Sequence, residues 1–221
     1  MSSAIVVTGT DTDVGKTVFC AGLTRLLDGM YWKPVQAGLQ GETDTETVRR
    51  LGELAADRVL PEAWALHTAA SPHLAAEIDH VEIDPHALAL PPSERPLVVE
   101  GAGGLMVPLT RQTLLIEVIA AWGAPVVLCA RPRLGTINHT LLSIEALRRR
   151  AIPLLGVAFV GEAHPENERI VGSLGKVAIL GRLPHLDPLT PQTLADAFAR
   201  AFQPESFSSP AARFGSSRRL P

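Results

Sequence analysis

Residues 9–17, GTDTDVGKT, constrain the fold of this chain more than any other stretch. They follow the apolar run AIVV and precede a segment with helical periodicity. A phosphate-binding loop needs backbone N–H groups that point at oxygens, a helix N-terminus behind them, and a lysine that reaches the outer phosphates. Gly15, Lys16 and Thr17 can supply all three. We therefore predict a nucleotide site with Lys16 on the phosphates and the Thr17 hydroxyl placed for Mg²⁺.

The first glycine of this loop lies one residue earlier than in the common pattern of a glycine, four residues and Gly-Lys-Ser/Thr. That pattern requires a glycine at position 10, where this chain has Thr10 directly after Gly9. Because a threonine is more restricted in backbone conformation than a glycine, we expect a variant loop in which Thr12 and Asp13 approach the ligand. The residues of this stretch that we assign to the nucleotide are Thr12, Asp13, Val14, Gly15, Lys16, Thr17 and Val18.

Short β-branched runs alternate with longer helical patterns along the rest of the chain. Runs such as LVVE, PVVLCA and LLGVAFV are continuously apolar, which is typical of strands covered on both faces in a parallel sheet. We therefore predict a single-domain α/β fold of the P-loop NTPase type, with a mostly parallel sheet, helices on both faces, and ligands beyond the C-terminal strand ends. The predicted strands cover residues 4–8, 31–35, 96–100, 125–130, 154–160 and 177–180, and the predicted helices cover residues 15–27, 44–55, 113–122, 138–150, 166–174 and 191–202.

Composition and charge limit where the protein works and what it binds. The net charge of −3 argues against nucleic acid or an anionic membrane as a partner, and no apolar run approaches the ~18 residues of a membrane span. The N-terminus lacks the pattern of a signal peptide, and Cys20 and Cys129 form no CxxC pair, so we expect a cytoplasmic protein with reduced thiols. We expect a folded domain over residues 1–202 and a flexible Ser-, Pro- and Arg-rich tail over residues 203–221.

Two acidic residues are candidate magnesium ligands. Glu100 follows the apolar run LVV and precedes Gly-Ala-Gly-Gly. An acid at the end of a parallel strand, beside a phosphate loop, is well placed to bind Mg²⁺ or to orient water, and the glycines allow close approach of the backbone to a ligand. Asp44 follows Thr43 and precedes Glu46, a pattern that also suits plain helix capping. The residues alone leave the role of Asp44 open.

The loop variant GTDTxVGKT resembles the start of the dethiobiotin synthetases, a family of biotin-pathway enzymes within the wider P-loop group. Further stretches agree with that family in the same order and together span most of residues 5–190. Each alone is weak evidence, but the ordered set is highly specific. The stretches are KPVQAG (33–38), TD (43–44), SPH (71–73), VEGAGGLMVPL (99–109) and LGTINHTLL (134–142).

The resemblance implies an ATP-dependent carboxylation. One amine of 7,8-diaminononanoate takes up CO₂ to give a carbamate, the carbamate attacks the γ-phosphate of ATP, and the second amine closes the ring to give dethiobiotin and phosphate. It also implies that Lys33 and Lys16 are catalytic and that Thr17, Asp44 and Glu100 bind Mg²⁺. The chemistry is plausible, because two ammonium groups and a divalent cation can offset the repulsion between a carbamate and a phosphate.

The resemblance extends to the rest of the nucleotide and substrate sites. It implies a homodimer in which the segment at residues 135–138 comes from the neighbouring subunit, and Asn138, as the N-cap of a helix, would leave N–H groups free for the substrate carboxylate. The further nucleotide residues are Gly101, Ala102, Gly103, Val160, Gly161, Pro184, His185 and Leu186, and the substrate residues are Thr12, Lys33, Ala37, Gly135, Thr136, Ile137 and Asn138.

Two positions depart from the family pattern. Ala37 stands where many relatives carry a Ser or Thr that touches the substrate, so Gln36 or a water would have to replace that hydroxyl. Val160 and Gly161 stand where relatives often carry Asn-Asp, whose amide contacts the adenine edge. We therefore expect recognition of the base to depend on backbone groups and nucleotide discrimination to be loose.

Three other classes of protein and a pure binding module are alternatives to an enzyme of this family. Segregating ATPases of a related P-loop branch carry an extra lysine five residues before the main one, where this chain has Asp11. Nucleotide-dependent switch proteins normally contain Asn-Lys-x-Asp, which is absent here. A related amidoligase would need a glutamine-hydrolysing domain with a nucleophilic cysteine, for which neither cysteine has the setting. A pure binding module remains open, and formation of a urea product from the diamine, bicarbonate and MgATP separates all of these.

Overall fold

The main sheet confirms the predicted α/β class. The structure, a computed structural model, describes residues 4–208, and seven strands follow the order β4-β2-β6-β1-β7-β8-β9. Every neighbouring pair is parallel, so all the strands end at one edge of the sheet. The strands are β1 (Ala4–Gly9), β2 (Met30–Trp32), β4 (Val59–Leu60), β6 (Leu97–Gly104), β7 (Val126–Ala130), β8 (Leu154–Val160) and β9 (Ile179–Leu183).

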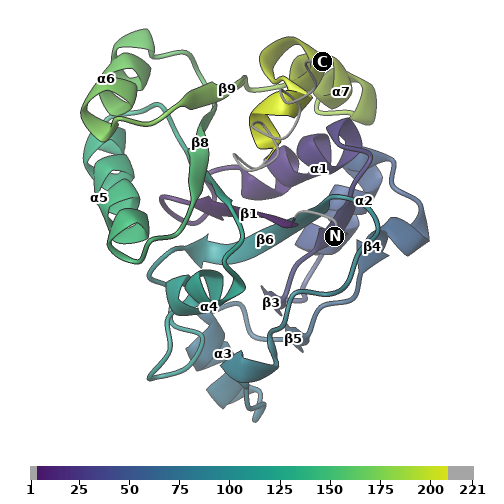
Figure 1. Cartoon of the computed structure of the whole chain (residues 1–221). Coiled ribbons are helices and arrows are strands. Elements are labelled where there is room, and N and C mark those ends of the chain that lie inside the picture. Colours follow the sequence, from purple (N-terminus) through teal and green to yellow (C-terminus); the bar gives the residue numbers. More distant parts are fainter. Residues whose placement is uncertain (1–3, 209–221) are drawn as a thin grey trace, which may run out of the picture.

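Helices cover both faces of this sheet, as Figure 1 shows. On β1, Ile5 and Val7 face the core under one helical layer while Val6 faces the opposite core. This double burial explains why the strands are continuously apolar. One layer contains α1 (Lys16–Leu26), α2 (Asp44–Gly52) and α7 (Pro191–Ala201), and the other contains α4 (Leu115–Trp122), α5 (Thr136–Arg149) and α6 (Pro165–Gly175).

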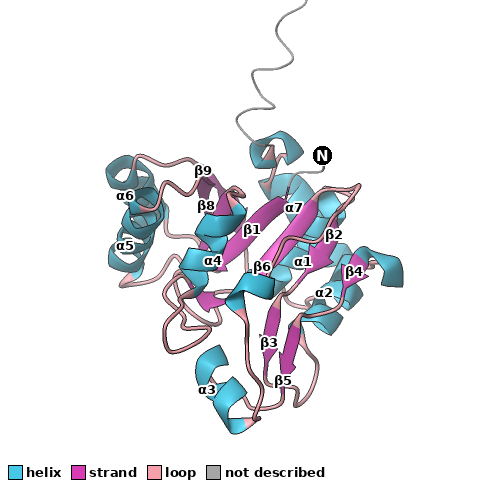
Figure 2. Ribbon diagram, turned by 60° about the horizontal axis from the view of Figure 1, so that its bottom comes forward, coloured by secondary structure: helices cyan, strands magenta, loops and turns pink. Residues whose placement is uncertain are grey.

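A second, two-stranded sheet was not predicted. The single strand expected at residues 31–35 is divided by Lys33 and Pro34, because a proline cannot donate to a strand ladder. After this break, β3 (Val35–Ala37) leaves the main sheet and pairs with β5 (Trp64–Leu66). The short helix α3 (Pro72–Ile78) packs beside this pair (Figure 2). The chain leaves the main sheet at this break. Lys33 therefore lies directly after the end of β2, at the edge of the main sheet.

The start of α5 corrects one prediction. We expected the helix to begin at Asn138, with that residue as its N-cap. The helix begins at Thr136, and Gly135 is the N-cap with a left-handed φ of 91°. A glycine adopts this conformation without the steric penalty of a side chain, so the turn is completed two residues earlier than the capping pattern indicated. Asn138 therefore lies inside the first helical turn.

The packed part of the chain extends beyond residue 202, where we expected the domain to end. Residues Pro204–Phe207 form a short 3₁₀ helix, and the Phe207 side chain is 2% exposed. Its ring centroid lies 6.3 Å from that of Phe19 on α1. The sequence analysis missed Phe207 because the residues around it are rich in proline and serine, a composition typical of a flexible tail. The rest of the expected tail, residues 209–221, lies outside the described residues.

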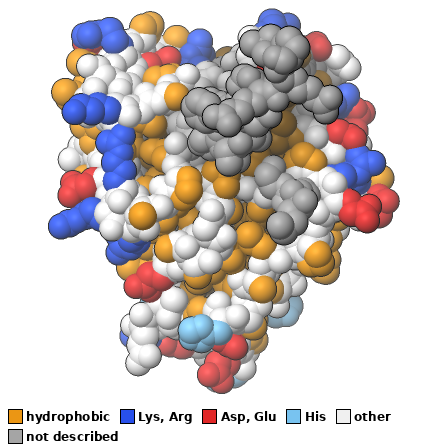
Figure 3. Space-filling view, in the orientation of Figure 1, with side chains coloured by type: hydrophobic (Ala, Val, Ile, Leu, Met, Phe, Trp, Pro, Cys, Tyr) orange, Lys and Arg blue, Asp and Glu red, His pale blue; other side chains and the backbone are white. Residues whose placement is uncertain are grey.

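Two further observations concern the surface charge and the length of the helices. Lys and Arg side chains gather over the side of the molecule that α5 and α6 form (Figure 3). Within the part of the chain that the structure describes, no helix has the length and apolar character needed to cross a bilayer.

Candidate functional site

The loop after β1 explains the position of the early glycine. A Cβ atom added to Gly9 would lie 2.8 Å from the carbonyl oxygen of Asp11 and 2.7 Å from a methyl carbon of Val14, so the loop folds back over this residue. Asp13 and Gly15 have left-handed φ angles of 54° and 90°. The Thr10 N–H donates to the Cys129 carbonyl on β7 at 3.0 Å. In this loop the close backbone approach falls at position 9, and position 10 tolerates a side chain.

The loop ends at the N-terminus of α1. Gly15 is the N-cap, and no side chain among residues 4–208 caps this helix, so its first N–H groups remain available to an anion. Lys16 is buried, and its Nζ donates to the Asp11 carbonyl at 3.2 Å. Burial lowers the pKa of Lys16, although the nearby Glu100 opposes this shift. The ammonium group is thus held over the loop, where the predicted phosphates would lie.

Lys33 forms a buried charge cluster with two carboxylates. Its Nζ lies 2.5 Å from Asp44 Oδ2 and 3.3 Å from Glu100 Oε1. Lys33 is 4% exposed and Glu100 is 1% exposed. Burial by itself would lower the pKa of Lys33, but the charges of Glu100 and Asp44 outweigh it and raise that pKa. Burial likewise opposes ionisation of Asp44, yet Lys33 and Thr17 lower its pKa. Both shifts favour the charged forms of Lys33 and Asp44.

The Thr17 hydroxyl contacts the same two carboxylates. Its Oγ1 lies 3.0 Å from Asp44 Oδ1 and 2.9 Å from Glu100 Oε1. A hydroxyl, two carboxylates and a neighbouring phosphate loop form the hard-oxygen donor set that Mg²⁺ prefers. Among residues 4–208 no group of three or more His, Cys, Asp or Glu side chains could hold a metal, so phosphate oxygens and water would have to complete such a site. Asp44 also begins α2, whose Thr43–Glu46 capping box is present. The capping role that the sequence left open is therefore confirmed, and it leaves the Asp44 carboxylate turned toward Thr17 and Lys33.

Tyr31 is a site residue that the sequence analysis missed. Its hydroxyl donates to Glu100 Oε2 at 2.9 Å, so both oxygens of this carboxylate are engaged. Burial raises the pKa of Tyr31, and the negative charge of Glu100 raises it further, which keeps the hydroxyl protonated. The available signal was the spacing: Tyr31 and Lys33 are two residues apart in an extended stretch and can face the same side.

A pocket of about 420 Å³ opens beside Lys33. One end is polar, with Lys33 and Asp44, and much of the remaining wall is apolar. Of the predicted substrate residues, Thr12, Lys33 and Ala37 line it, whereas residues 135–138 do not. The Gln36 side chain also lines it, but its amide donates to the carbonyls of Ala37 and Gly38. The other lining residues are Val35, Ala69, Ala70, Ser71, Pro72, Ala102, Gly103 and Val107.

Close packing of Gly103 joins this pocket to the phosphate loop. Val7 pairs with Glu100 and Gly9 pairs with Gly104, so β6 advances four residues where β1 advances two, and residues 101–103 bulge out. A Cβ added to Gly103 would lie 3.4 Å from the Thr12 hydroxyl and 2.8 Å from a Val107 methyl carbon. The glycines after Glu100 thus allow the loop and the pocket wall to meet.

The residues predicted to surround the base lie at the ends of β8 and β9. Val160 contacts the phosphate loop, because a Cβ on Gly15 would lie 2.6 Å from Val160 Cγ1. The Gly161 N–H donates to the Leu183 carbonyl at 2.9 Å, and the Gly161 carbonyl accepts from Arg182 Nη1 at 3.1 Å. Both backbone groups of Gly161 are therefore occupied by the protein. Residues 184–186, which we also predicted to contact the base, follow the end of β9 at Leu183.

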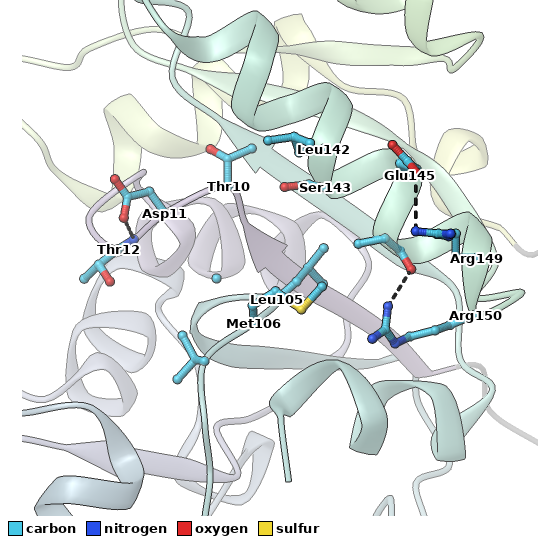
Figure 4. Close-up of a pocket in the computed structure, with 13 residues that line it drawn as sticks. Thr10, Asp11, Thr12, Leu105, Met106, Leu142, Ser143, Glu145, Arg149 and Arg150 are labelled. Carbon is cyan, nitrogen blue, oxygen red and sulfur yellow. Dashed lines mark hydrogen bonds and ion pairs between the residues drawn. The ribbon is translucent and has the colours of Figure 1, made fainter. Parts of the chain in front are cut away.

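A second pocket of about 570 Å³ adjoins the first and shares Thr12 and Val107 with it. Figure 4 shows residues 10–12 of the phosphate loop on one side, residues of α5 on the other, and Leu105 and Met106 between them. Leu142 on α5 and Met106 are both largely exposed. This second pocket thus presents apolar side chains to its surroundings at the mouth of the site.

Comparison with known proteins adds evidence on the family. A family model described as an AAA domain matches residues 3–193. The chain is 67% identical over 202 residues to the ATP-dependent dethiobiotin synthetase BioD of Rhodopseudomonas palustris (strain BisA53), covering 91% of this chain and 95% of that protein. It is 62% identical to the BioD protein of Nitrobacter hamburgensis and 55% identical to that of Brucella melitensis, in each case over 94% of this chain and 98% of the relative.

Solved structures with the same fold are more distant in sequence. The septum site-determining protein MinD of Pyrococcus horikoshii, in complex with Mg-ADP, aligns with a TM-score of 0.52 at 13% identity, over 89% of this chain and 86% of that one. A ParA family ATPase from Chlorobium tepidum aligns with a TM-score of 0.52 at 10% identity, over 93% and 96%. At these identities the likeness establishes the P-loop fold alone.

The contact between Tyr31 and Glu100 gives a test of how the site is held together. Tyr31→Phe leaves one oxygen of a buried carboxylate without its donor, and we expect the free energy of unfolding to fall by roughly 1.5–3 kcal/mol. Thr24→Val is the control, because the buried Thr24 hydroxyl donates to a neutral carbonyl, that of Cys20. Urea denaturation should give the smaller loss for Thr24→Val; an equal or smaller loss for Tyr31→Phe contradicts the assignment.

Proposed function

We propose a reaction course for this chain on the premise that it belongs to the family of ATP-dependent dethiobiotin synthetases, as relatives 55–67% identical over most of its length establish. It is accordingly an ATP-dependent ligase. We also propose a cytoplasmic location, which suits the two buried free thiols of Cys20 and Cys129.

The proposed reaction has three steps. An amine of 7,8-diaminononanoate bonds to the carbon of CO₂, loses a proton and becomes a carbamate. A carbamate oxygen then attacks the γ-phosphorus of ATP, and ADP leaves with the electron pair of the broken P–O bond. Finally the second amine bonds to the carbamoyl carbon, the C–O bond to phosphate breaks, and dethiobiotin and phosphate are released.

The single observation that carries this proposal is the buried ammonium of Lys33 at the polar end of a pocket that also reaches the phosphate loop. The carbamate and the triphosphate are both anions and repel each other. Lys33 would balance the charge on the carbamate and the bridging oxygens, and Lys16 would balance the γ-phosphate. Preorganised charges in a water-poor site are the main means by which phosphoryl transfer is accelerated.

The donor set around Thr17 supports Mg²⁺ as the metal that accompanies ATP. Thr17, Asp44 and Glu100 would hold it, and their oxygens converge as the hydrogen bonds of Thr17 require. When bound, Mg²⁺ supplies neutralisation of phosphate charge. Tyr31, by donating to Glu100, fixes the orientation of one of these carboxylates.

The shape of the pocket beside Lys33 suits the diamine. Its polar end could receive the two amines, and the apolar wall formed by residues such as Val35, Pro72 and Val107 could receive the aliphatic chain. Lys33 is the one basic residue among the lining residues, and Asp44 and Glu100 already pair with it. The far carboxylate of the substrate therefore needs a partner from outside this pocket.

We propose that a second copy of the chain supplies that partner. Leu134, just before α5, is 100% exposed, and Met106 and Leu142 are exposed at the adjoining pocket shown in Figure 4. Large exposed apolar side chains that gather near one site are typical of an interface. Gly135 caps α5 without a side-chain bond from the described residues. The Thr136 N–H donates to the Arg133 carbonyl at 3.0 Å, which leaves the N–H groups of Ile137 and Asn138 for a carboxylate. In the proposed homodimer, the exposed apolar side chains would form the contact, and the start of α5 of one subunit would face the pocket beside Lys33 of the other.

The function is tested by product formation. With 7,8-diaminononanoate, bicarbonate and MgATP, we expect one dethiobiotin, one ADP and one phosphate per turnover, detected by mass spectrometry and coupled assay. Lys33→Ala should lower kcat by roughly 10²–10³, the usual cost of losing one preorganised donor. Lys176→Gln, which changes an exposed lysine remote from the site, should keep the wild-type rate. ADP release that does not require the diamine would contradict the proposed function.

Nucleotide selectivity tests the account of the base site. Because both backbone groups of Gly161 are occupied and no side-chain amide replaces the family's asparagine, kcat/KM for ATP, CTP, GTP and UTP should differ by less than about tenfold, whereas sites that hydrogen-bond their substrate often discriminate by roughly 10⁴. A strong preference for ATP under matched Mg²⁺ would show that residues 184–186 or others do distinguish the base.

The dimer is tested by a charge at its proposed contact. Leu134→Asp should convert a wild-type dimer to a monomer in sedimentation velocity and abolish turnover, because an exposed apolar anchor is replaced by a hydrated charge. Leu174→Asp is the matched control, since Leu174 is also exposed but lies on α6, away from the turn at residues 134–135 that leads into α5. A wild-type protein that is monomeric and fully active would contradict the proposed subunit arrangement.

A further inference from the structure

A serine and a histidine at the start of α3 form a polar pair that the proposed reaction has not used. Ser71 lines the pocket beside Lys33. Its Oγ lies 3.0 Å from Nδ1 of His73, which is half-buried behind the pocket wall. The two residues thus connect the pocket to a ring nitrogen that does not itself line it.

The pair is held in place by its backbone. Ser71 is the N-cap residue of α3, a position where a serine hydroxyl usually accepts from a backbone N–H of the first turn. No such cap bond is found for Ser71, and its hydroxyl is turned toward His73. The His73 N–H donates to the Pro108 carbonyl at 3.2 Å, next to the lining residue Val107. This bond anchors α3 to the opposite wall of the pocket.

Ring closure needs a proton acceptor inside this pocket. The second amine carries a proton too many once it has bonded to the carbamoyl carbon, and that proton must leave before the urea is stable. The other ionisable groups at the pocket, Lys33 and Asp44, are paired with each other, and Lys33 is also paired with Glu100. On the far side of His73, Glu77 lies on the same helix and is paired with Arg111 at 2.6 Å. The His73 ring, whose Nδ1 lies 3.0 Å from Ser71 Oγ, is the remaining candidate base beside the pocket.

We propose that Ser71 and His73 form a proton relay for ring closure. The nitrogen of the second amine forms its bond to the carbamoyl carbon, and the C–O bond to phosphate breaks with the electron pair leaving on phosphate. The surplus proton on nitrogen passes to Ser71 Oγ while the hydroxyl proton passes to His73 Nδ1. His73, which is half-exposed, then releases its proton to water. This inference rests on the proposed function, and Ser71 is the member of the pair that contacts substrate.

The experiment separates ring closure from phosphorylation in the first turnover. Rapid quench of wild-type enzyme with the diamine, bicarbonate and MgATP gives the rates of ADP and dethiobiotin formation separately. For His73→Asn and for Ser71→Ala we expect ADP to form at the wild-type rate while dethiobiotin forms roughly 100-fold more slowly, as is typical for loss of general base catalysis. Ser71→Thr, which keeps the hydroxyl, should recover most of the rate, and His86→Asn, at an exposed histidine outside the site, should not change it.

Two further outcomes decide the proposal. The double variant with both substitutions should be no slower than either single one, because both remove the same path. If ADP and dethiobiotin formation fall together in the single variants, or if neither changes, the relay is wrong and the pair only shapes the pocket. A wild-type enzyme that makes no dethiobiotin would instead overturn the proposed function, so the two failures are distinguishable.

Discussion

The arrangement of the whole site depends on the buried ammonium of Lys33 between Asp44 and Glu100. Removing one partner from such a cluster commonly costs about 3–5 kcal/mol, because the charges left behind lie out of water. Here the attraction is strong enough to raise the pKa of Lys33 despite its burial. Burying these charges costs free energy unless each has a partner. The cluster therefore fixes the start of α2, the end of β2 and β6 relative to one another.

The parallel sheet makes this geometry possible. β2, β6 and β1 are neighbours, so Lys33, Glu100 and the phosphate loop all emerge at one edge, although they are far apart in sequence. The break at Lys33 and Pro34 then sends the chain into a second small sheet, which supplies the apolar wall of the pocket. The result is a pocket with the Lys33 ammonium in its lining and an apolar wall beside it, which suits the diamine of the proposed function.

Much of this could be predicted from the sequence, for specific reasons. The phosphate loop, Glu100 and the parallel strands carry local patterns, and the ordered family motifs identified Lys33. What was missed depends on contacts between distant elements: Tyr31 resembles an ordinary core residue, β3 and β5 are three residues long, and Phe207 lies in a stretch rich in proline and serine. Asn138 was given the wrong helical position because a glycine in a left-handed conformation completes the turn earlier.

The most direct measurement is a crystal structure of the protein with a non-hydrolysable ATP analogue, Mg²⁺ and 7,8-diaminononanoate. We expect Lys33 Nζ within hydrogen-bonding distance of both the terminal phosphate and the amine end of the substrate. Thr17, Asp44 and Glu100 should surround the metal at about 2.1 Å or through one water. A complex in which Lys33 Nζ stays more than about 6 Å from the terminal phosphate, beyond direct charge pairing, would contradict it.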